Sequence, residues 1–453
     1  MKDIRRLFGT DGIRGLANRE LTAELALKVG RAGAKFLTGS RSRGKIIIGR
    51  DPRPSGDLLK NALSAGILSS GHDVIDAGII TTPAVALIAN IMNLDGGAVI
   101  SASHNPLEDN GIKLFGKNGQ KLSDIQEKEI EDYIADDLDN NSLPVGNDVG
   151  RYEYLEDAPK VYLDRVCGKY DMDLKGLKIV LDCANGASSI LAVKALERFG
   201  PDVITYNTGL TGENINDNCG STHPEQLKKL VIAESADIGF AYDGDGDRVI
   251  ACDGKGNVLD GDSIIAFCAL DMVKNNKLKN NKLVTTIMAN MGFEKLMNEN
   301  GIEVEKTPVG DRYVLERMLE TDSALGGEQS GHIIFKDISP TGDGIISTLE
   351  FLSAIVKSGY DINKIYDLVP RFPQYLENIR VTDKNKIMEC EEVRAKVMEM
   401  EGFLGGKGRI VLRPSGTEPL IRIMVEAEKQ DLVNQVIGEL SRVIEEKCGE
   451  LKN

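Results

Sequence analysis

Three aspartates alternate with glycines in the stretch Asp243-Gly-Asp-Gly-Asp-Arg248. Glycine allows the tight backbone that brings three carboxylates onto one hard cation. An EF-hand loop needs Gly at its sixth position and Glu at its twelfth, but Arg248 and Gly254 stand there, so this kind of calcium site is excluded. Three carboxylates leave room for waters and a phosphate oxygen, which suits Mg²⁺. We expect a magnesium site that also binds a phosphate, with an exposed acidic turn as the alternative.

A second polar loop, Ser101-Ala-Ser-His-Asn-Pro106, follows an apolar run. A serine hydroxyl is a weak nucleophile that needs a base or a strong electrophile beside it. A phosphate carried on serine would complete the magnesium site, and the ion would draw charge from the phosphoryl group during transfer. Ser103 lies in the turn, whereas Ser101 is expected within the strand. An ordinary Asn-Pro turn is the alternative interpretation.

The third candidate is a phosphate cradle near the C-terminus, Arg413-Pro-Ser-Gly-Thr-Glu-Pro419. It follows an expected strand and offers an arginine fork, two hydroxyls and backbone N–H groups next to glycine, which suit a dianionic phosphate. Arg422 is placed to assist. The same residues would also fit a plain turn.

Three further segments place polar groups near these loops. Arg14 lies on a glycine-rich turn, Phe8-Gly-Thr-Asp-Gly-Ile-Arg-Gly15, where a structural turn with a solvated arginine is the alternative. Lys113 follows the serine loop closely enough to reach the same cleft. Glu328, Ser330 and His332 stand at alternate positions of Gly327-Glu-Gln-Ser-Gly-His332 and supply donors and acceptors for sugar hydroxyls.

A pattern of strands and helices repeats three times and positions these loops. In each copy, two β-branched strands separated by a helix-length segment precede a third short strand that ends in a polar loop. Such alternation is typical of α/β folds, where ligands gather at the carboxyl ends of the strands. We therefore expect the loops to face one shared cleft. The first strands are Lys45–Asp51, Leu177–Asp182 and Leu283–Met288, and the second are Gly71–Asp76, Gly200–Thr205 and Gly301–Glu305.

The last part of the chain has a different pattern. Pro370-Arg-Phe-Pro373 indicates a linker, and three strands with a final helix beyond it predict a small α+β domain. Four domains follow, at residues 1–155, 156–256, 257–369 and 370–453. The three strands are expected at 378–382, 408–413 and 420–426, and the helix at 431–448.

Composition limits the classes of protein that this chain can represent. The 453 residues are too many for one core, and the 41 % hydrophobic and 28 % charged content is ordinary for a globular protein. A net charge of −15 argues against nucleic acid as a partner. No apolar run is long enough for a membrane span, and the seven cysteines contain no Cys-x-x-Cys pair. We expect a cytoplasmic protein with reduced thiols and without a membrane partner.

Taken together, the motifs resemble those of the α-D-phosphohexomutases. The resemblance covers essentially the whole chain in the family's order and spacing. It implies an α/β fold in which three similar α/β domains with mixed sheets and a smaller C-terminal α+β domain surround a central active-site cleft. The motifs that carry it are Gly9-Thr-Asp-Gly-Ile-Arg-Gly15, Ser101-Ala-Ser-His-Asn-Pro106, Asp243-Gly-Asp-Gly-Asp-Arg248, Gly327-Glu-Gln-Ser-Gly-His332 and Arg413-Pro-Ser-Gly-Thr-Glu418.

The resemblance implies a role for each matching residue. Ser103 would be the phosphoserine, and its phosphate would share the metal ion with Asp243, Asp245 and Asp247. The other catalytic candidates, for electrostatic stabilisation and acid–base work, are Arg14, His104, Lys113, Arg248 and His332. The substrate-binding candidates are Asp311, Arg312, Glu328, Ser330, His332, Arg413, Ser415, Gly416, Thr417 and Arg422.

The implied reaction is a two-step phosphoryl exchange on a small phosphosugar. Phosphoserine would phosphorylate O1 of glucosamine 6-phosphate, and the 1,6-bisphosphate would turn around and return its 6-phosphate. A sugar 1,6-bisphosphate would act as activator, the product would feed UDP-N-acetylglucosamine and cell-wall synthesis, and a homodimer is possible. Glucose and mannose phosphates are alternative substrates, because only Gln329 and the loop around Asp311 favour glucosamine. An inactive sugar-phosphate or metal-binding module is the alternative from another class.

Overall fold

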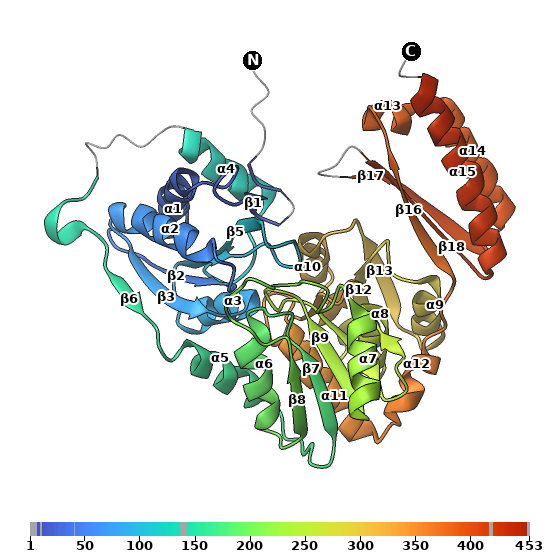
Figure 1. Ribbon diagram of the computed structural model, residues 1–453, viewed down its shortest axis with the longest axis horizontal. Helices are drawn as coiled ribbons and strands as arrows, with labels where there is room; N and C mark the ends of the chain where they lie inside the picture. The colour runs from blue at the N-terminus through green and yellow to red at the C-terminus, as the bar shows by residue number, and fades with distance from the viewer. Residues whose placement is uncertain (1–6, 10, 40, 136–142, 416–419, 451–453) are drawn as a thin grey trace. The chain divides into compact units, whose positions relative to one another are not determined.

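The computed structural model describes residues 7–9, 11–39, 41–135, 143–415 and 420–450 (Figure 1). The chain forms two compact units, Met1–Thr286 with Ile302–Leu368, and Ile287–Gly301 with Val369–Asn453. The first unit contains three mixed sheets and the second a three-stranded antiparallel sheet. The predicted class, repeated α/β domains plus a smaller C-terminal α+β domain, is confirmed. The four domain boundaries stay predictions.

The first sheet has six strands in the order β1-β5-β4-β2-β3-β6. β3, β2 and β4 run parallel, as does β6, whereas β5 is antiparallel to both β4 and β1. Its elements are β1 (Ile13–Leu16), α1 (Ala23–Thr38), β2 (Lys45–Arg50), α2 (Gly56–Ser69), β3 (Asp73–Ile79), α3 (Thr82–Ile91), β4 (Gly96–Ile100), β5 (Asp109–Gly116), α4 (Asp124–Ala135) and β6 (Tyr152–Tyr154).

The second and third sheets repeat this plan, with the orders β11-β10-β9-β7-β8 and β13-β12-β14-β15. The second set of elements is α5 (Ala158–Cys167), β7 (Lys178–Asp182), α6 (Ser188–Glu197), β8 (Asp202–Tyr206), α7 (Pro224–Glu234), β9 (Ile238–Tyr242), β10 (Val249–Asp253) and β11 (Val258–Leu259). The third is α8 (Gly261–Lys274), β12 (Lys282–Thr286), α9 (Met291–Glu299), β13 (Glu303–Thr307), α10 (Asp311–Glu320), β14 (Leu325–Gly327), β15 (Ile333–Phe335), α11 (Gly344–Ser358) and α12 (Ile365–Leu368).

One strand pair is common to the three sheets and explains where the polar loops lie. β4, β9 and β14 each run parallel to the first strand of their repeat, and each is followed by an antiparallel neighbour. The connection between the two strands therefore begins at the carboxyl end of a buried strand. These connections carry the serine loop, the aspartate loop and the Glu328 loop. Ser101 was expected within β4, but the strand ends at Ile100 and Ser101 already belongs to the loop.

Buried β-branched strands and capped helices hold these sheets together. Ile46, Ile47 and Ile48 of β2 are each at most 1 % exposed, as their continuous apolar run predicts for a strand covered on both faces. Thr22 caps α1 by accepting a hydrogen bond from the Leu25 N–H at 3.2 Å, which satisfies a donor that a helix start leaves unpaired.

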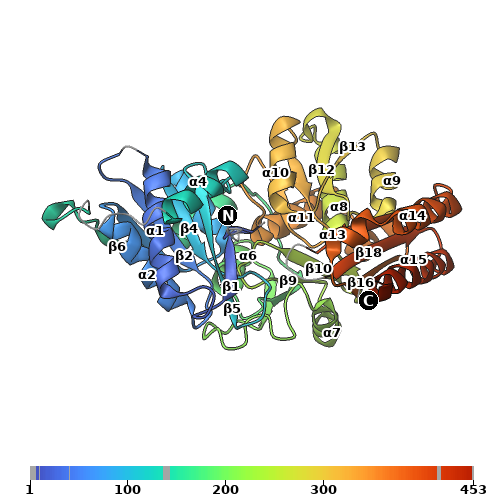
Figure 2. The ribbon, with the colours of Figure 1, turned by 90° about the horizontal axis from the view of Figure 1, so that it is seen from above.

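The smaller unit is a sheet with helices packed along it. β18 lies between β16 and β17, and α14 and α15 pack on each other and on the sheet (Figure 2). Valine and isoleucine side chains from the strands and α15 form its core. Its elements besides α9 are β16 (Gln374–Arg380), α13 (Lys384–Glu389), α14 (Glu391–Leu404), β17 (Gly408–Pro414), β18 (Leu420–Ala427) and α15 (Gln430–Glu450). Within the described residues, we find no helix with the length and apolarity that crossing a bilayer requires.

Candidate active site

Three polar loops of the larger unit meet at the carboxyl ends of β4, β9 and β14. The Ser103 hydroxyl donates to Asp243 Oδ2 at 2.6 Å, which joins the first loop to the second. Val249 begins β10 directly after the second loop, and its N–H donates to the Gly331 carbonyl at 3.1 Å, which brings the third loop beside the second. The expected convergence of these three loops is therefore present.

Ser103 has an unusual backbone conformation. Its φ angle is 53°, in the left-handed region, where a residue with a Cβ is disfavoured by about 1–2 kcal/mol. The side chain is buried, and its Oγ lies 3.2 Å from His104 Nδ1 as well as against Asp243. Burial, with Arg248 and Arg14 nearby, lowers the pKa of His104 to about 4, so this ring is neutral around pH 7.

The aspartate loop forms a compact cluster of oxygen ligands. Asp243, Asp245 and Asp247 are buried and each offers a carboxylate oxygen, with all of these oxygens within 4.8 Å of one another. Across the described residues, no hydrogen bond reaches Asp245 Oδ1 or Asp247 Oδ1, although both atoms are buried. Burial and the neighbouring aspartates raise the pKa of Asp243 well above its usual range. A divalent cation fits this donor set, because it would compensate the negative charge of the buried carboxylates and bind their free oxygens.

The glycines of this loop are needed because the chain passes close to its neighbours. A Cβ on Gly244 would lie 2.6 Å from the Ser103 carbonyl oxygen. Gly246 has a φ of 72°, and a Cβ there would lie 2.7 Å from Thr81 Cγ2. Gly244 therefore seats the aspartate loop on the serine loop, and Gly246 seats it on Thr81 at the start of α3.

Lys113, on β5, is buried against the aspartate loop. Its Nζ lies 2.9 Å from Asp245 Oδ2, 3.8 Å from Asp247 Oδ2 and 3.1 Å from Asp11 Oδ2. Burial opposes its charge, but Asp11 and Asp245 outweigh burial and raise the pKa of Lys113. The lysine is therefore a cation here, and Asp11 is a partner that the sequence analysis did not single out, although it stands in the quoted Gly9–Gly15 motif.

Two arginines complete the positive side of the cluster. Arg14 pairs with Asp11 and donates through Nη1 to Asn105 Oδ1 at 3.2 Å, so it reaches the serine loop. The Arg248 backbone N–H donates to Asp243 Oδ1 at 3.2 Å, and its Nε lies 3.8 Å from Asp247 Oδ1. Arg14 therefore reaches the serine loop and Arg248 the aspartate loop, and their expected role in charge stabilisation stays a prediction.

His332, from the third loop, lies between two carboxylates. Its Nδ1 is 3.6 Å from Asp247 Oδ2 and its Nε2 is 3.8 Å from Asp311 Oδ2. Although burial acts in the opposite direction, Asp247 and Asp311 raise the pKa of His332. Lys121, which the sequence analysis did not select, bridges Asp311 and Asp11. The start of α10, which lies beside His332, is thereby tied to the first domain by a partly buried cation.

The other candidates on the third loop have varied surroundings. Glu328 Oε1 accepts a hydrogen bond from the Gly310 N–H at 3.2 Å, and Ser330 is exposed. Gln329 donates to Asp260 Oδ2 at 3.2 Å, and Asp260 is the N-cap of α8. Glu328 thus lies beside the start of α10, and the Gln329 amide supports a helix terminus.

Arg312 contacts the first domain. Its Nη2 donates to Asp124 Oδ1 at 2.6 Å, and its Nη1 donates to Glu127 Oε2 at 3.2 Å and to the Leu122 carbonyl at 3.3 Å. The guanidinium group therefore pairs with the acidic residues of α4. Its expected contact with substrate stays a prediction.

The phosphate cradle lies in the smaller unit. Arg413 on β17 is paired in register with Arg422 on β18, so both side chains leave the same face of the sheet and concentrate positive charge there. Lys384 donates to the Ser415 carbonyl at 2.6 Å and adds a third cation. Gly416 and Thr417 lie outside the described residues.

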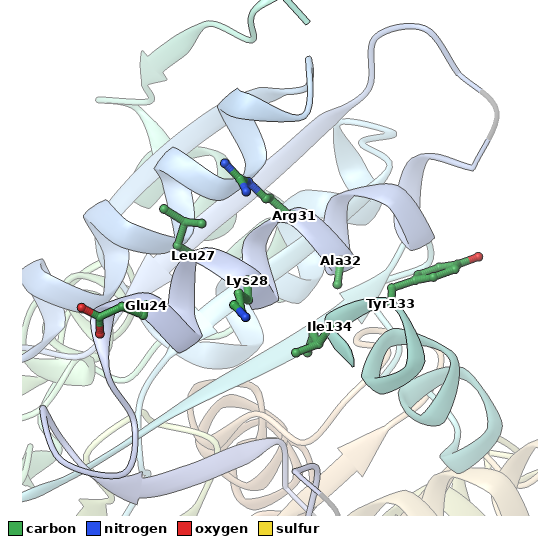
Figure 3. A pocket seen from close by; sticks show the side chains of 7 residues that line it. All are labelled: Glu24, Leu27, Lys28, Arg31, Ala32, Tyr133 and Ile134. Carbon is green, nitrogen blue, oxygen red and sulfur yellow. The ribbon is translucent and has the colours of Figure 1, made fainter. Parts of the chain in front are cut away.

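A cavity of about 240 Å³ lies between α1 and α4, away from these loops in the sequence (Figure 3). None of its lining residues belongs to the clusters described above. The residues are Glu24, Leu27, Lys28, Arg31, Ala32, Tyr133 and Ile134.

The arrangement of phosphorylatable serine, carboxylate cluster and cationic loops defines a class of phosphotransfer enzyme, and the chain belongs to the phosphoglucomutase/phosphomannomutase family. Models of its alpha/beta/alpha domains I, II and III match residues 5–141, 160–256 and 260–372, and the C-terminal domain model matches residues 376–443.

Particular relatives narrow the comparison. The phosphoglucosamine mutase of a Thermoanaerobacter species is 48 % identical over 446 residues, which cover 98 % of this chain and 100 % of that protein. The phosphoglucosamine mutase of Clostridioides difficile is 48 % identical over 447 residues, with 98 % and 100 % covered.

Solved structures share the fold at lower identity. A phosphoglucomutase/phosphomannomutase family protein from Burkholderia thailandensis has a TM-score of 0.82 at 24 % identity, covering 96 % of each chain. The Aspergillus fumigatus N-acetylphosphoglucosamine mutase, solved in complex with GlcNAc-6P and magnesium, has a TM-score of 0.65 at 16 % identity, covering 96 % of this chain and 95 % of that one.

Proposed function

We propose that this protein interconverts glucosamine 6-phosphate and glucosamine 1-phosphate through a phosphorylated Ser103. The observation that carries the proposal is the 2.6 Å hydrogen bond from Ser103 Oγ to Asp243, within a buried cluster of three aspartates. Relatives named phosphoglucosamine mutase are 48 % identical over nearly the whole chain, which supports this substrate. The protein is thus an intramolecular phosphotransferase.

The first step transfers the phosphoryl group from Ser103 Oγ to O1 of glucosamine 6-phosphate. The O–P bond at serine breaks, the sugar O–P bond forms, the proton of the sugar hydroxyl passes to a base, and the departing serine oxygen takes up a proton to become a hydroxyl. Glucosamine 1,6-bisphosphate then turns around, and its 6-phosphate returns to Ser103, which leaves glucosamine 1-phosphate. A free sugar 1,6-bisphosphate acts as activator, because it restores the phosphoserine when the intermediate is lost.

The side chains around Ser103 divide this work. Arg14 and Arg248 offset charge on the transferring group, while Lys113 and His332 are the candidates for moving the proton. Because Lys113 is a cation here, it must lose its own proton before it can accept one from the sugar. Neutral His104 keeps a ring nitrogen 3.2 Å from Ser103 Oγ. Charge stabilisation and proton transfer both require these side chains to lie within hydrogen-bond distance of the reacting oxygens.

Asp243, Asp245 and Asp247 are the residues that would hold Mg²⁺, together with the phosphate on Ser103. A bound magnesium ion neutralises phosphate charge and polarises the phosphorus–oxygen bonds. Asp245 Oδ1 and Asp247 Oδ1 are buried and receive no hydrogen bond from the part of the chain that the structure describes, which supports this assignment.

The substrate contacts come from two sets of residues. Glu328 and Ser330, with Asp311, offer acceptors and a hydroxyl for the sugar. The phosphate that is not reacting would be bound by the cradle of the smaller unit. The cradle residues are Arg413, Ser415, Gly416, Thr417 and Arg422.

The first test compares kcat/KM for glucosamine 6-phosphate, glucose 1-phosphate and mannose 1-phosphate, with Mg²⁺ and a trace of sugar bisphosphate. We expect glucosamine 6-phosphate to be preferred by about tenfold or more, which is about 1.4 kcal/mol of transition-state binding. Ser103→Ala should abolish activity, and intact-mass measurement should find a phosphoryl group on wild type only. A preference for glucose or mannose would keep the mechanism and change the substrate. Activity in Ser103→Ala would reject the mechanism.

A further inference from the structure

The main chain of Ser103 is held on both sides by residues outside the site assigned above. On its N–H side, Ser103 donates to Ser101 Oγ at 2.9 Å, and that hydroxyl donates onward to Asp51 Oδ2 at 2.6 Å. Asp51 follows β2, so the support comes from the neighbouring strand. The Ser103 N–H is thereby tied to a buried carboxylate.

The carbonyl of Ser103 is held by two further donors. Arg53 Nη2 donates to it at 3.1 Å and Asn216 Nδ2 donates to it at 2.9 Å. Arg53 is fully buried and also donates to the Asn105 carbonyl at 2.7 Å and to the Asp109 carbonyl at 3.1 Å. One guanidinium group therefore fastens the serine loop at several carbonyl oxygens.

The Asp51–Arg53 pair supports both the N–H and the carbonyl group of Ser103. Arg53 Nε lies 3.1 Å from Asp51 Oδ2, the oxygen that accepts from Ser101. Because Ser103 has φ 53°, rotation out of the left-handed region would break these bonds and turn Oγ away from Asp243. The network thus opposes the rotation that the strained backbone favours.

Asn216 carries this support from the second domain. A Cβ on Gly244, in the aspartate loop, would lie 2.9 Å from Asn216 Nδ2, so the amide lies against the aspartate loop while it donates to the serine loop. A Cβ on Gly212 would lie 1.9 Å from the Pro52 carbonyl oxygen, which shows how closely this segment is seated on the first domain. Asn216 is placed to keep the two loops in register.

We propose that Asp51, Arg53, Ser101 and Asn216 are positioning residues for phosphoryl transfer, which act by holding Ser103 Oγ against the aspartate loop. The inference rests on the proposed function, since it assumes that Ser103 carries the phosphoryl group. None of the four side chains needs to touch the sugar. Their loss should therefore lower kcat without a matching rise in KM.

Asn216→Gly is the most direct variant. Asn216 has φ 59°, which glycine adopts freely, so this change deletes the amide without adding backbone strain. The matched control is Asn218→Gly, because Asn218 lies in the same loop at φ 51° and is exposed. Ser101→Ala tests the N–H side of Ser103 independently.

We expect Asn216→Gly and Ser101→Ala each to lower kcat by about tenfold or more, with KM changed less than about threefold. Asn218→Gly should retain kcat within about twofold. Thermal unfolding of all variants separates this effect from loss of fold. The proposal is overturned if both variants keep wild-type kcat, or if Asn218→Gly loses as much activity as Asn216→Gly. It is also overturned if kcat of the variants returns to the wild-type value at temperatures where all the proteins are fully folded.

A second readout separates this inference from the choice of substrate. The rate at which glucose 1,6-bisphosphate phosphorylates Ser103 is followed by intact mass for wild type and both variants. Slower phosphorylation of the variants supports the positioning role, even if glucosamine 6-phosphate is a poor substrate for wild type. Equal rates in all three proteins would reject the positioning role while leaving the proposed reaction standing.

Discussion

At the scale of single residues, the charges of the three aspartates are unevenly compensated, since the pKa of Asp247 is lowered while that of Asp243 is raised. Lys113 contacts Asp245 and Asp247, yet burial and its neighbours still raise the pKa of Asp243. Such a cluster is destabilising until a cation enters it. Ligand binding to the folded state alone then adds to the free energy of unfolding.

We predict that Mg²⁺ raises the Tm of the wild-type protein and that Asp245→Asn reduces this effect. At a concentration about 100 times Kd, binding adds about 2.7 kcal/mol, which corresponds to a Tm shift of about 3 °C for 453 residues that unfold together. Differential scanning fluorimetry with and without Mg²⁺ measures the shift. Asp202→Asn, which removes an exposed carboxylate of β8, is the control and should keep the wild-type shift. Equal shifts in all three proteins would place the ion elsewhere.

At the scale of elements, Asp343 joins α11 to α5. Its carboxylate caps α11 by accepting from the Ile345 and Ile346 N–H groups at 2.9 and 3.0 Å, and the Tyr162 hydroxyl of α5 donates to it at 2.7 Å. Burial outweighs these hydrogen bonds and raises the pKa of Asp343 to about 6. The folded protein therefore holds a proton between about pH 4 and pH 6 that the unfolded chain releases.

This sign predicts how stability changes with pH. The contribution of Asp343 is largest below about pH 4, decreases as pH rises to about 6 and is constant above that, a change of about 3 kcal/mol at most. Asparagine caps a helix and accepts from Tyr162 without titrating. The free energy of unfolding of Asp343→Asn, minus that of wild type, should therefore increase as pH rises from 4.5 to 7. Urea unfolding midpoints of the two proteins measure this difference. A difference between the two proteins that is independent of pH would contradict this assignment.

At the scale of the whole molecule, buried charge pairs connect domains far apart in the sequence. Arg312 pairs with Asp124 and Glu127, more than 180 residues earlier. The pair with Glu127 is buried, at 6 % and 9 % side-chain exposure, whereas Asp124 is half exposed. Removing one partner of a buried pair leaves the other charge uncompensated, which costs about 3 kcal/mol. These pairs bind α10 to α4.

We predict that Arg312→Met lowers the Tm clearly while KM for glucosamine 6-phosphate changes less than about threefold. Arg317→Met, on the same helix, is the control, because Arg317 forms exposed pairs worth about 1 kcal/mol or less. Thermal unfolding and steady-state kinetics of both variants give the comparison. A KM raised about tenfold with an unchanged Tm would instead make Arg312 a substrate ligand.

The sequence by itself determined the repeated strand–helix pattern, the small α+β C-terminal domain and the loops that hold Ser103 and the three aspartates. These features are local: β-branched runs form buried strands, and glycines allow the tight turns that carboxylates need. The tertiary structure alone decided which distant side chains meet. Asn216 and Ser103 are 113 residues apart in the sequence, and Lys121 and Asp311 are 190 apart. Nothing in the sequence around Arg53 indicates that its guanidinium group donates to four carbonyl groups. The reason is physical: such contacts arise from the packing of whole domains, which depends on the complete set of buried surfaces and charges and not on any one stretch of sequence.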